Sequence, residues 1–240
     1  MTLPTAIILA GGFGSRLRSV VPNLPKPLAP IHGMPFLHYL LEDLKSQGVR
    51  RTVISTGYLA EIIEARLGHQ HGPMEILYSR EDAPLGTGGA LKLAIDRFGL
   101  NKEVLALNGD TYFPAPLEHM LSVLRKTPSA HFAIALKRLP YADRYGTVEL
   151  AKNGTIGCFV EKGLKRDGLI NGGIYALRTK VFDAIAPGEF FSLETTLLVP
   201  LAETGSLVGL PFDAPFIDIG MPEDYARASQ VVPTPTRISN

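Results

Sequence analysis

The sequence has no tryptophan, and cysteine occurs only once among its 240 residues. A single cysteine, Cys158, excludes a disulfide within the chain and fits a protein of a reducing compartment. Because Cys158 stands in the apolar stretch IGCFVEK, we expect it to be a small buried core residue.

The chain also has almost no net charge, since 24 Lys and Arg oppose 23 Asp and Glu for a formal balance of +1. A large nucleic-acid-binding surface brings an excess of basic residues, so we expect no nucleic-acid partner. Any affinity for phosphate then has to be local. The six histidines are scattered along the sequence, and no metal-binding pattern of Cys and His stands out.

Long hydrophobic runs are missing as well. The first apolar segment, AIILA, has only five residues and no basic stretch before it, which argues against a signal peptide. No segment approaches the roughly 20 apolar residues that a membrane-spanning helix needs. We therefore expect a cytoplasmic protein with no membrane partner.

The first half of the chain alternates short apolar runs with amphipathic segments of helical length. Such alternation predicts βαβ units and a mostly parallel sheet, with helices on both faces. The expected strands are Ala6–Ala10, Thr52–Thr56, Met74–Ser79 and Glu103–Asp110, and the expected helices are Pro35–Gly48, Leu59–Gly68 and Gly89–Gly99.

The second half has a different pattern, with a predicted hairpin at Gly146–Lys162 that turns at Asn153-Gly154. Further strands are expected at His131–Leu139, Leu169–Arg178, Ser206–Phe212 and Pro215–Gly220, and helices near Thr179–Ile185, Leu193–Thr204 and Pro222–Gln230. Neither a repeat nor a linker divides the chain. We predict one domain over 1–240, with halves at about 1–115 and 116–232 and a loose tail at 233–240.

The first apolar run leads directly into LAGGFGSRLRSVVPNLPKPL, at the end of a strand where open parallel sheets bind ligands. Gly11, Gly12 and Gly14 would let backbone N–H groups approach an anion, and Arg16 and Lys26 supply positive charge. We predict a phosphate-binding loop; a flexible glycine turn with solvated cations is the alternative. The spacing does not fit a Walker loop. It does not fit the GxGxxG pattern either, because Leu17 stands where that pattern requires its third glycine.

Charged residues also follow apolar segments elsewhere. Asp110 ends VLALNGD and Asp218 follows PFI, so both carboxylates would face the ligand crevice of a parallel sheet. Taken alone, Asn108 to Asp110 would equally fit a plain turn, and Asp218 would fit a cap near the last helix. Glu161 and Lys162, taken alone, fit an exposed ion pair.

The motifs LAGGFGSRL and PKPL, followed in order by LGTGGAL, NGD, RYGTVEL, VEKG, NGGIY and FIDIGMPEDY, resemble those of the sugar-1-phosphate nucleotidyltransferases. The resemblance covers most of the chain, and Ser15 replaces a commoner threonine while keeping the hydroxyl. It implies a Rossmann-like α/β fold, a single domain whose mixed, mostly parallel central sheet is flanked by helices. It also implies attack by a sugar-1-phosphate oxygen on the α-phosphorus of a nucleoside triphosphate, with release of pyrophosphate.

The same resemblance implies roles for individual residues. Asp110 and Asp218 would hold Mg²⁺, Arg16 and Lys26 would be catalytic cations at the triphosphate, and Lys162 would hold the acceptor phosphate. The first half of the chain would bind the nucleotide through Leu9, Ala10, Gly11, Gly12, Gly14, Ser15, Arg16, Lys26, Gly57, Gly86, Thr87, Gly88, Asn108 and Asp110. The second half would bind the sugar phosphate through Tyr145, Gly146, Glu161, Lys162, Asn171, Gly172 and Glu194.

Within the family, RSVVPNLPKPLAPI, LINGGIYAL and FIDIGMPEDY are most similar to guanylyltransferases acting on D-glycero-α-D-manno-heptose 1-phosphate. This implies GTP and heptose 1-phosphate as substrates, and GDP-heptose for capsule or lipopolysaccharide synthesis. Glu81, Asp82 or backbone carbonyls of residues 56–58 are candidate acceptors for guanine. Mannose-1-phosphate guanylyltransferase and an amino-sugar-1-phosphate uridylyltransferase are the alternatives, and a non-catalytic nucleotide-sugar-binding subunit is more remote. The oligomeric state is open, a homodimer included.

Overall fold

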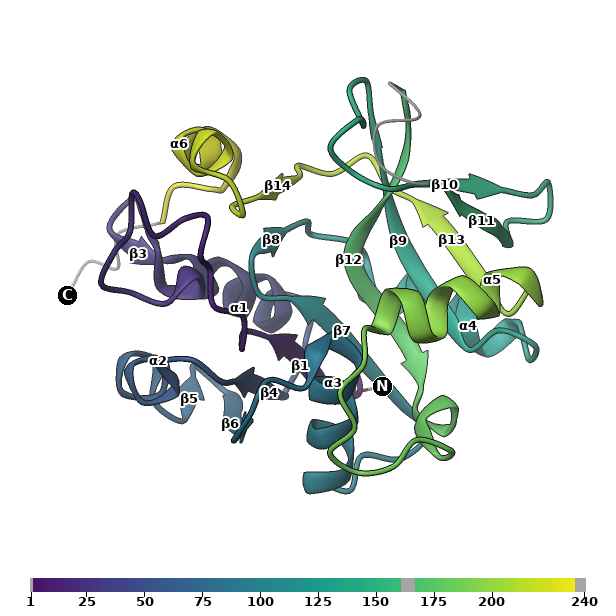
Figure 1. Ribbon diagram of the computed structural model, residues 1–240, viewed down its shortest axis with the longest axis horizontal. Coiled ribbons are helices and arrows are strands. Elements are labelled where there is room, and N and C mark those ends of the chain that lie inside the picture. Colours follow the sequence, from purple (N-terminus) through teal and green to yellow (C-terminus); the bar gives the residue numbers. More distant parts are fainter. Residues whose placement is uncertain (1, 161–166, 236–240) are drawn as a thin grey trace.

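A mixed β-sheet is the frame of the computed structural model, which describes residues 2–160 and 167–235 (Figure 1). The parallel centre of this sheet consists, in hydrogen-bonded order, of β7 (Glu103–Asn108), β1 (Ala6–Leu9), β4 (Arg51–Thr56) and β6 (Met74–Arg80). The short β5 (Gln70–His71) adds to β6 in the antiparallel direction. β1 and the middle of β7 are apolar runs because side chains on both of their faces are buried.

The second half of the chain extends the sheet with strands that are mostly antiparallel to their neighbours: β9 (Phe132–Leu139), β10 (Thr147–Leu150), β11 (Ile156–Val160), β12 (Gly168–Arg178) and β13 (Leu207–Pro211). The long β12 joins the halves, since it pairs with β7 so that Ile174 lies opposite Leu107. Its register with β9 shifts between Asn171 and Tyr175, and its first part pairs with β10 as well.

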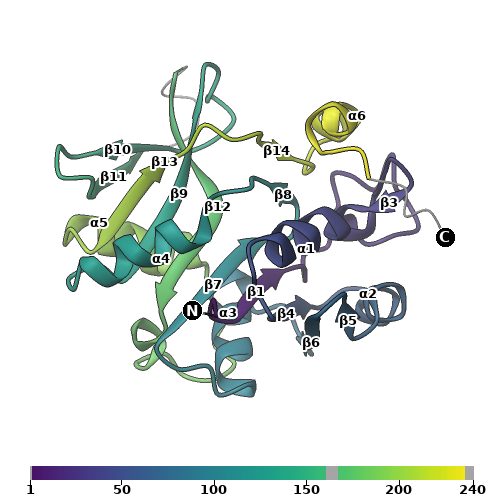
Figure 2. The same cartoon turned by 180° about the vertical axis from the view of Figure 1, so that it is seen from behind.

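Helices cover both faces of the sheet, as Figures 1 and 2 show from opposite sides. They are α1 (Phe36–Ser46), α2 (Ala60–Leu67), α3 (Gly86–Arg97), α4 (Leu117–Lys126) and the π-helix η3 (Leu193–Leu198) with α5 (Val199–Glu203). The last helix, α6 (Pro222–Val231), lies apart from the sheet, and the hydroxyl of its Tyr225 donates to the carbonyl of Pro30 at 2.7 Å (Figure 1). α1 and α4 pack with Ile8 in one core cluster, and α3 and η3 pack with Ile7 in the other. Both clusters contain residues from both halves of the chain, so the described residues form one domain.

Two short ladders lie outside the main sheet. β2 (Pro30–Ile31) and β3 (Met34–Pro35) form a hairpin between the 3₁₀ turn η1 (Lys26–Leu28) and α1. β8 (Thr111–Tyr112), just after β7, pairs with β14 (Ile217–Asp218), just before α6. The second ladder brings the last part of the chain back to the carboxyl end of β7, beside the loop that follows β1 (Figure 1).

Most of the predicted elements are confirmed to within a few residues, as is the mixed sheet flanked by helices. Two predicted helices differ: the segment from Thr179 forms only the 3₁₀ turn η2 (Thr179–Phe182), and the segment from Leu193 begins as a π-helix. The prediction that Cys158 is a core residue is wrong. It is exposed on β11, the outermost strand on its side, with its Sγ 3.5 Å from Oε2 of Glu149.

None of the helices in the described ranges is both long enough and apolar enough to cross a membrane.

Asp43, on α1, is a partly buried carboxyl group that accepts a hydrogen bond from Nε2 of Gln47 at 3.0 Å. Burial raises the pKa of Asp43 from 3.8 to about 6, and the Gln47 hydrogen bond only partly opposes this. The folded state therefore binds this proton more tightly than the unfolded state, and this group lowers stability as the pH rises from 3.8 to about 6.

Asp43→Asn is accordingly expected to raise the free energy of unfolding by about 2 kcal/mol at about pH 8, because one pKa unit corresponds to about 1.4 kcal/mol and partial exposure reduces the full shift. The gain should shrink to a small fraction at about pH 4, where the carboxyl is largely protonated in both states. Urea unfolding at the two pH values measures the effect, with the exposed Asp213→Asn as control. An equal gain at both pH values would contradict the assignment.

Candidate active site

A cavity of about 440 Å³ opens where β1 and β7 end at the carboxyl edge of the sheet. Of the residues predicted to contact a nucleotide, all but Gly57 and Gly88 line it: Leu9, Ala10, Gly11, Gly12, Gly14, Ser15, Arg16, Lys26, Gly86, Thr87, Asn108 and Asp110. The other lining residues are Phe13, Pro27, Glu81, Pro84, Ala90, Gly109, Phe190 and Gly220. Segments far apart in the sequence thus meet at the place where parallel sheets bind ligands.

The loop after β1 wraps around the side chain of Lys26. Gly14 has a φ of +58°, and a Cβ at this position would lie 2.9 Å from the Cβ of Lys26, so both its conformation and its contact require glycine. A Cβ at Gly12, in contrast, would have no atom within 4 Å. Arg16 is exposed on the same loop, with Nη1 3.6 Å from Sδ of Met221. The loop therefore presents two cations to the cavity, with open space beside Gly12.

The β8–β14 ladder brings together the two aspartates of the sequence analysis. Asp218 lies opposite Thr111 in this ladder, and the N–H of Ile219 donates to the carbonyl of Asp110 at 2.9 Å. The ammonium group of Lys26 contacts Oδ2 of Asp110 and lies 3.9 Å from Oδ1 of Asp218. A short antiparallel pairing therefore places both carboxylates around one lysine.

The charge at this point is unbalanced, because one ammonium faces two carboxylates. Burial raises the pKa of Asp218, and the charge of Asp110 raises it further, while Lys26 and the N–H of Gly220 oppose the rise. The side chain of Lys26 is only 12% exposed, so little water screens the group. Two carboxylates with excess negative charge, open to a cavity, fit a divalent cation that prefers oxygen ligands, such as Mg²⁺.

The start of α3 packs against the segment that contains Phe191. A Cβ at Gly88 would lie 2.0 Å from the Phe191 ring, and the N–H groups of Gly88 and Gly89 both face the carbonyl of Phe191, at 3.1 and 3.4 Å. Thr87 donates to Oε2 of Glu194 at 2.9 Å. Gly88 is thus buried against the protein's own chain, and Glu194 supports Thr87 on the cavity wall.

Glu81 is a lining residue that the sequence analysis named only as one of several acceptors for a base. Its Oε2 accepts the N–H of Leu85 at 2.9 Å, and its Oε1 lies 3.5 Å from the hydroxyl of Ser55. Burial raises the pKa of Glu81, with these two hydrogen bonds opposing the rise. Asp82, its neighbour, is exposed and does not line the cavity.

Two aromatic lining residues, Phe13 and Phe190, were not predicted. They are 55% and 70% exposed, although phenylalanine is a residue that folding normally buries. Apolar rings at the edge of this cavity offer flat surfaces on which a base can stack. Phe13 stands inside the LAGGFGSRL motif and Phe190 in none of the quoted motifs, and only their exposure in the folded chain reveals both rings as lining residues.

A second cavity, of about 340 Å³, lies beside β14. Asp218 lines it, together with Tyr145 and the arginines Arg144 and Arg227, whose guanidinium groups both contact the buried Asp224. Burial raises the pKa of Tyr145 to about 12, and the charge of Asp218 adds to the effect, so the phenol keeps its proton and can donate.

The remaining residues predicted to bind a sugar phosphate lie elsewhere. Asn171, in β12, donates to the hydroxyl of Tyr175 at 2.8 Å and accepts the N–H of Gly173 at 3.0 Å. Gly172 packs against the Phe113 ring, and Gly146 precedes β10. Neither cavity is lined by these residues. Glu161 and Lys162 lie outside the described residues.

Comparison with known proteins gives a consistent picture. The family model described as "Nucleotidyl transferase" matches residues 5–234. The chain is 42% identical over 225 residues to a D-glycero-alpha-D-manno-heptose 1-phosphate guanylyltransferase of Aneurinibacillus thermoaerophilus, covering 94% of this chain and 96% of that one. A protein of the same name from Campylobacter jejuni is 41% identical over 220 residues, with 92% and 96% covered.

Among solved structures, the crystal structure of HddC from Yersinia pseudotuberculosis superposes with a TM-score of 0.82 at 34% identity, covering 95% of this chain and 99% of HddC. The crystal structure of the same protein complexed with GMP-PN gives a TM-score of 0.80 at 32% identity, with the same coverage.

Proposed function

Since this chain belongs to the nucleotidyl transferase family, we propose that it transfers GMP from GTP to D-glycero-α-D-manno-heptose 1-phosphate and releases pyrophosphate. The observation that carries this function is the 41–42% identity to heptose 1-phosphate guanylyltransferases over nearly the full length of both chains. The likeness to HddC, whose complex holds GMP-PN, supports guanine as the base. The chain is therefore a guanylyltransferase, and the mannose and amino-sugar alternatives are not favoured.

This reaction requires positioning more than a protein nucleophile, because the sugar phosphate is already an anionic nucleophile. The arrangement of the two cavities supports such positioning. GTP would occupy the larger cavity, beside the loop after β1, and the heptose would occupy the smaller one. Gly220 lines the first and Asp218 the second, so the acceptor phosphate and the α-phosphate would meet at β14.

We propose Asp110 and Asp218 as the carboxylates that hold Mg²⁺. The support is their shared contact with Lys26 and the unbalanced negative charge around it. When bound, the ion supplies neutralisation of charge on the phosphate oxygens. Lys26 would then contact phosphate oxygens and stabilise the charge that develops as pyrophosphate leaves. Arg16 would bind the triphosphate from the exposed side of the cavity.

For the sugar phosphate, we propose Tyr145 and the two arginines of the second cavity as contacts. A protonated phenol can donate to a sugar oxygen, and Arg144 and Arg227 offer guanidinium groups for which an acceptor phosphate would compete with Asp224. Glu161, Lys162 and Asn171 remain predictions for this half of the site. Glu194 acts through Thr87 in this scheme, as a positioning residue.

Glu81 is our candidate for reading the base. Guanine presents the donors N1–H and N2–H₂ on one edge, and a carboxylate can accept from both, whereas adenine has no such pair of donors. Glu81→Gln is expected to lower kcat/KM for GTP about 10- to 100-fold while changing that for ATP little, since a good bidentate pair contributes about 1–3 kcal/mol of discrimination. Asp82→Asn, at the adjacent exposed carboxyl, is the control. Equal losses with GTP and ATP would remove Glu81 from this role.

The proposed function is tested by a matrix of pyrophosphate release, in which ATP, GTP, CTP and UTP are each combined with heptose, mannose, glucose and amino-sugar 1-phosphates. The expected result is turnover with GTP and heptose 1-phosphate well above every other combination. Highest turnover with mannose 1-phosphate would overturn the sugar assignment, and highest turnover with UTP would overturn the base. No release in any combination would point to the nucleotide-sugar-binding subunit.

The wider role belongs to the same proposal. A GDP-heptose product would serve capsule or lipopolysaccharide synthesis in bacteria, and the enzyme would act in the cytoplasm. A homodimer stays a prediction.

A further inference from the structure

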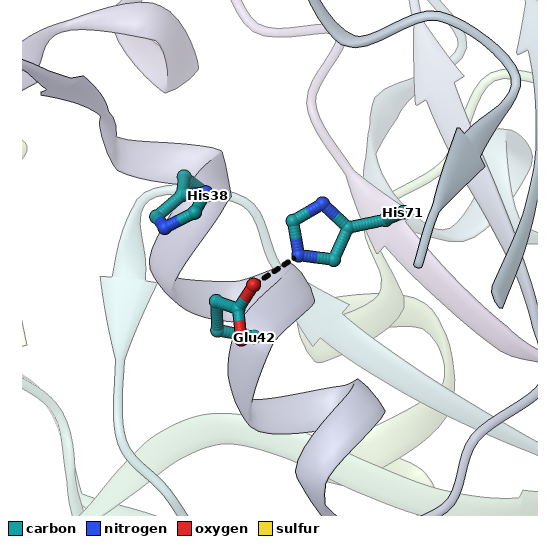
Figure 3. Close-up of side chains that lie close together, drawn as sticks. All are labelled: His38, Glu42 and His71. Carbon is teal, nitrogen blue, oxygen red and sulfur yellow. Dashed lines mark hydrogen bonds and ion pairs between the residues drawn. The ribbon is translucent and has the colours of Figure 1, made fainter. Parts of the chain in front are cut away.

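Three side chains at the junction of α1 and the β5–β6 hairpin form a cluster that neither cavity includes. They are His38, Glu42 and His71, each partly buried, and one ligand-capable atom from each lies within 4.8 Å of the others. In Figure 3, His38 and Glu42 project from successive turns of α1, and His71 points toward Glu42 from the hairpin. The sequence shows no metal-binding pattern of Cys and His, because only the fold brings His38 and His71 together.

The backbone on both sides of the cluster is held in place. His38 and Glu42 are four residues apart in a helix, which puts their side chains on one face. His71 pairs with Met74 in the hairpin, which turns at Gly72 with a φ of +58°. Nε2 of His71 lies 2.7 Å from Oε1 of Glu42, and the ring centroids of His38 and His71 are 5.4 Å apart. Side-chain rotations alone can therefore bring the three donor atoms to a common centre.

The surroundings act on two groups of the cluster. Burial lowers the pKa of His38, and the charges of His71 and Lys45 act in the same direction against the opposing charge of Glu42. For Glu42, burial alone would raise the pKa, but hydrogen bonds from Lys45 and His71 outweigh it and the pKa is lowered. Imidazole nitrogens and carboxylate oxygens are the atoms through which these residue types bind metal ions.

We propose that His38, Glu42 and His71 bind a divalent transition-metal ion, with Zn²⁺ the best match, which fastens α1 to the β5–β6 hairpin. Two imidazoles and one carboxylate are a donor set for Zn²⁺, whereas Mg²⁺ and Ca²⁺ prefer oxygen alone. With Zn–N and Zn–O bonds of about 2.0–2.2 Å in tetrahedral geometry, the donor atoms would stand about 3.3 Å apart, a small closure from their present spacing. Three protein ligands leave one position for water.

Lys45 is the competitor for this ion. Its ammonium nitrogen lies 2.6 Å from Oε2 and 2.7 Å from Oε1 of Glu42, so it already neutralises the carboxylate. Binding of a metal ion requires this ammonium to move away. Removing it should therefore strengthen metal binding, an effect in the opposite direction to that of removing a ligand.

Zn²⁺ binding to the full chain is measured by competition with a chromophoric chelator, for the unchanged protein and for His38→Gln, His71→Gln and Lys45→Gln. His69→Gln is the control, because His69 stands immediately before β5 but outside the cluster. We expect one Zn²⁺ per chain whose affinity falls in both histidine variants by more than the roughly 10–100-fold that loss of an outer-shell partner causes. Lys45→Gln should bind more tightly, and His69→Gln should match the unchanged protein.

Two further measurements separate this site from the carboxylates of the candidate active site and from a general loss of folding. Zn²⁺ at about 100 times its dissociation constant should raise the Tm by roughly 5 °C or more, and His38→Gln should abolish this rise without changing the metal-free Tm. Co²⁺ in place of Zn²⁺ should show the strong visible absorption of a four-coordinate site, again lost in His38→Gln. Zn²⁺ affinity unchanged in a His38→Gln/His71→Gln double variant, or weakened in Lys45→Gln, would overturn the proposal.

Discussion

Asp218→Asn is expected to lower the rate of pyrophosphate release by about 10³-fold at saturating substrates. Loss of one carboxylate from a metal site removes several kcal/mol of charge stabilisation, and each 1.4 kcal/mol changes the rate about tenfold. The substitution should leave the local structure intact, because Oδ1 of asparagine can still accept the N–H of Gly220, now 2.6 Å away. The physical reason is the loss of charge at a point that requires two negative groups to hold one divalent cation.

The same substitution should not lower stability. Burial and the charge of Asp110 both raise the pKa of Asp218, so its ionised form is disfavoured in the folded protein, and removing the charge leaves Lys26 paired with Asp110 alone. We expect an unchanged or slightly higher Tm at pH 8 beside the large loss of activity. Asp96→Asn, at a similarly exposed carboxylate that pairs with Lys92, is the control. Near-normal turnover in Asp218→Asn would exclude the metal assignment.

Lys26→Gln is expected to lower kcat to a similar extent, about 10³-fold, because the ammonium is the proposed partner of the departing pyrophosphate and one well-placed donor contributes about 3–4 kcal/mol in such sites. Its effect on stability should be the reverse of that in Asp218→Asn. Without the ammonium, two partly buried carboxylates face each other with no cation between them, and the Tm should fall.

A matched control exists for this lysine. Lys92 has almost the same exposure, 11% against 12%, and pairs with Asp96 on α3 without lining either cavity. Lys92→Gln should cost stability and leave kcat unchanged. In the double variant Lys26→Gln/Asp218→Asn, stability should recover while activity stays lost. If the double variant were as unstable as Lys26→Gln alone, the charge balance described for this cluster would be wrong.

The elements of the fold were predictable where the sequence pattern depends only on burial. The apolar run AIIL and the apolar centre of RTVIST become central strands because both of their faces are covered. Patterns that depend on neighbours were not predictable. Cys158 stands in an apolar run but lies on the outermost strand, and the β8–β14 ladder has only two residues on each side, too few for any period.

The candidate site was predictable through its motifs, and the structure explains where that reasoning stops. A glycine in a sequence does not tell what fills the space beside it. At Gly12 the space is open cavity, whereas at Gly88 it is filled by the ring of Phe191. No motif specifies a phenylalanine at Phe13 or Phe190, because the position of each ring at the cavity edge depends on where separate segments of the chain meet.

The position of the two-residue strand β14 has a consequence for how the binding of one substrate affects the binding of the other. Asp218 of β14 lines the smaller cavity and Gly220, two residues further on, lines the larger one, so a shift of this segment for one occupant would alter both cavities. The effect on binding is then reciprocal. If bound nucleotide changes the affinity for the sugar phosphate by some factor, bound sugar phosphate changes the affinity for the nucleotide by the same factor.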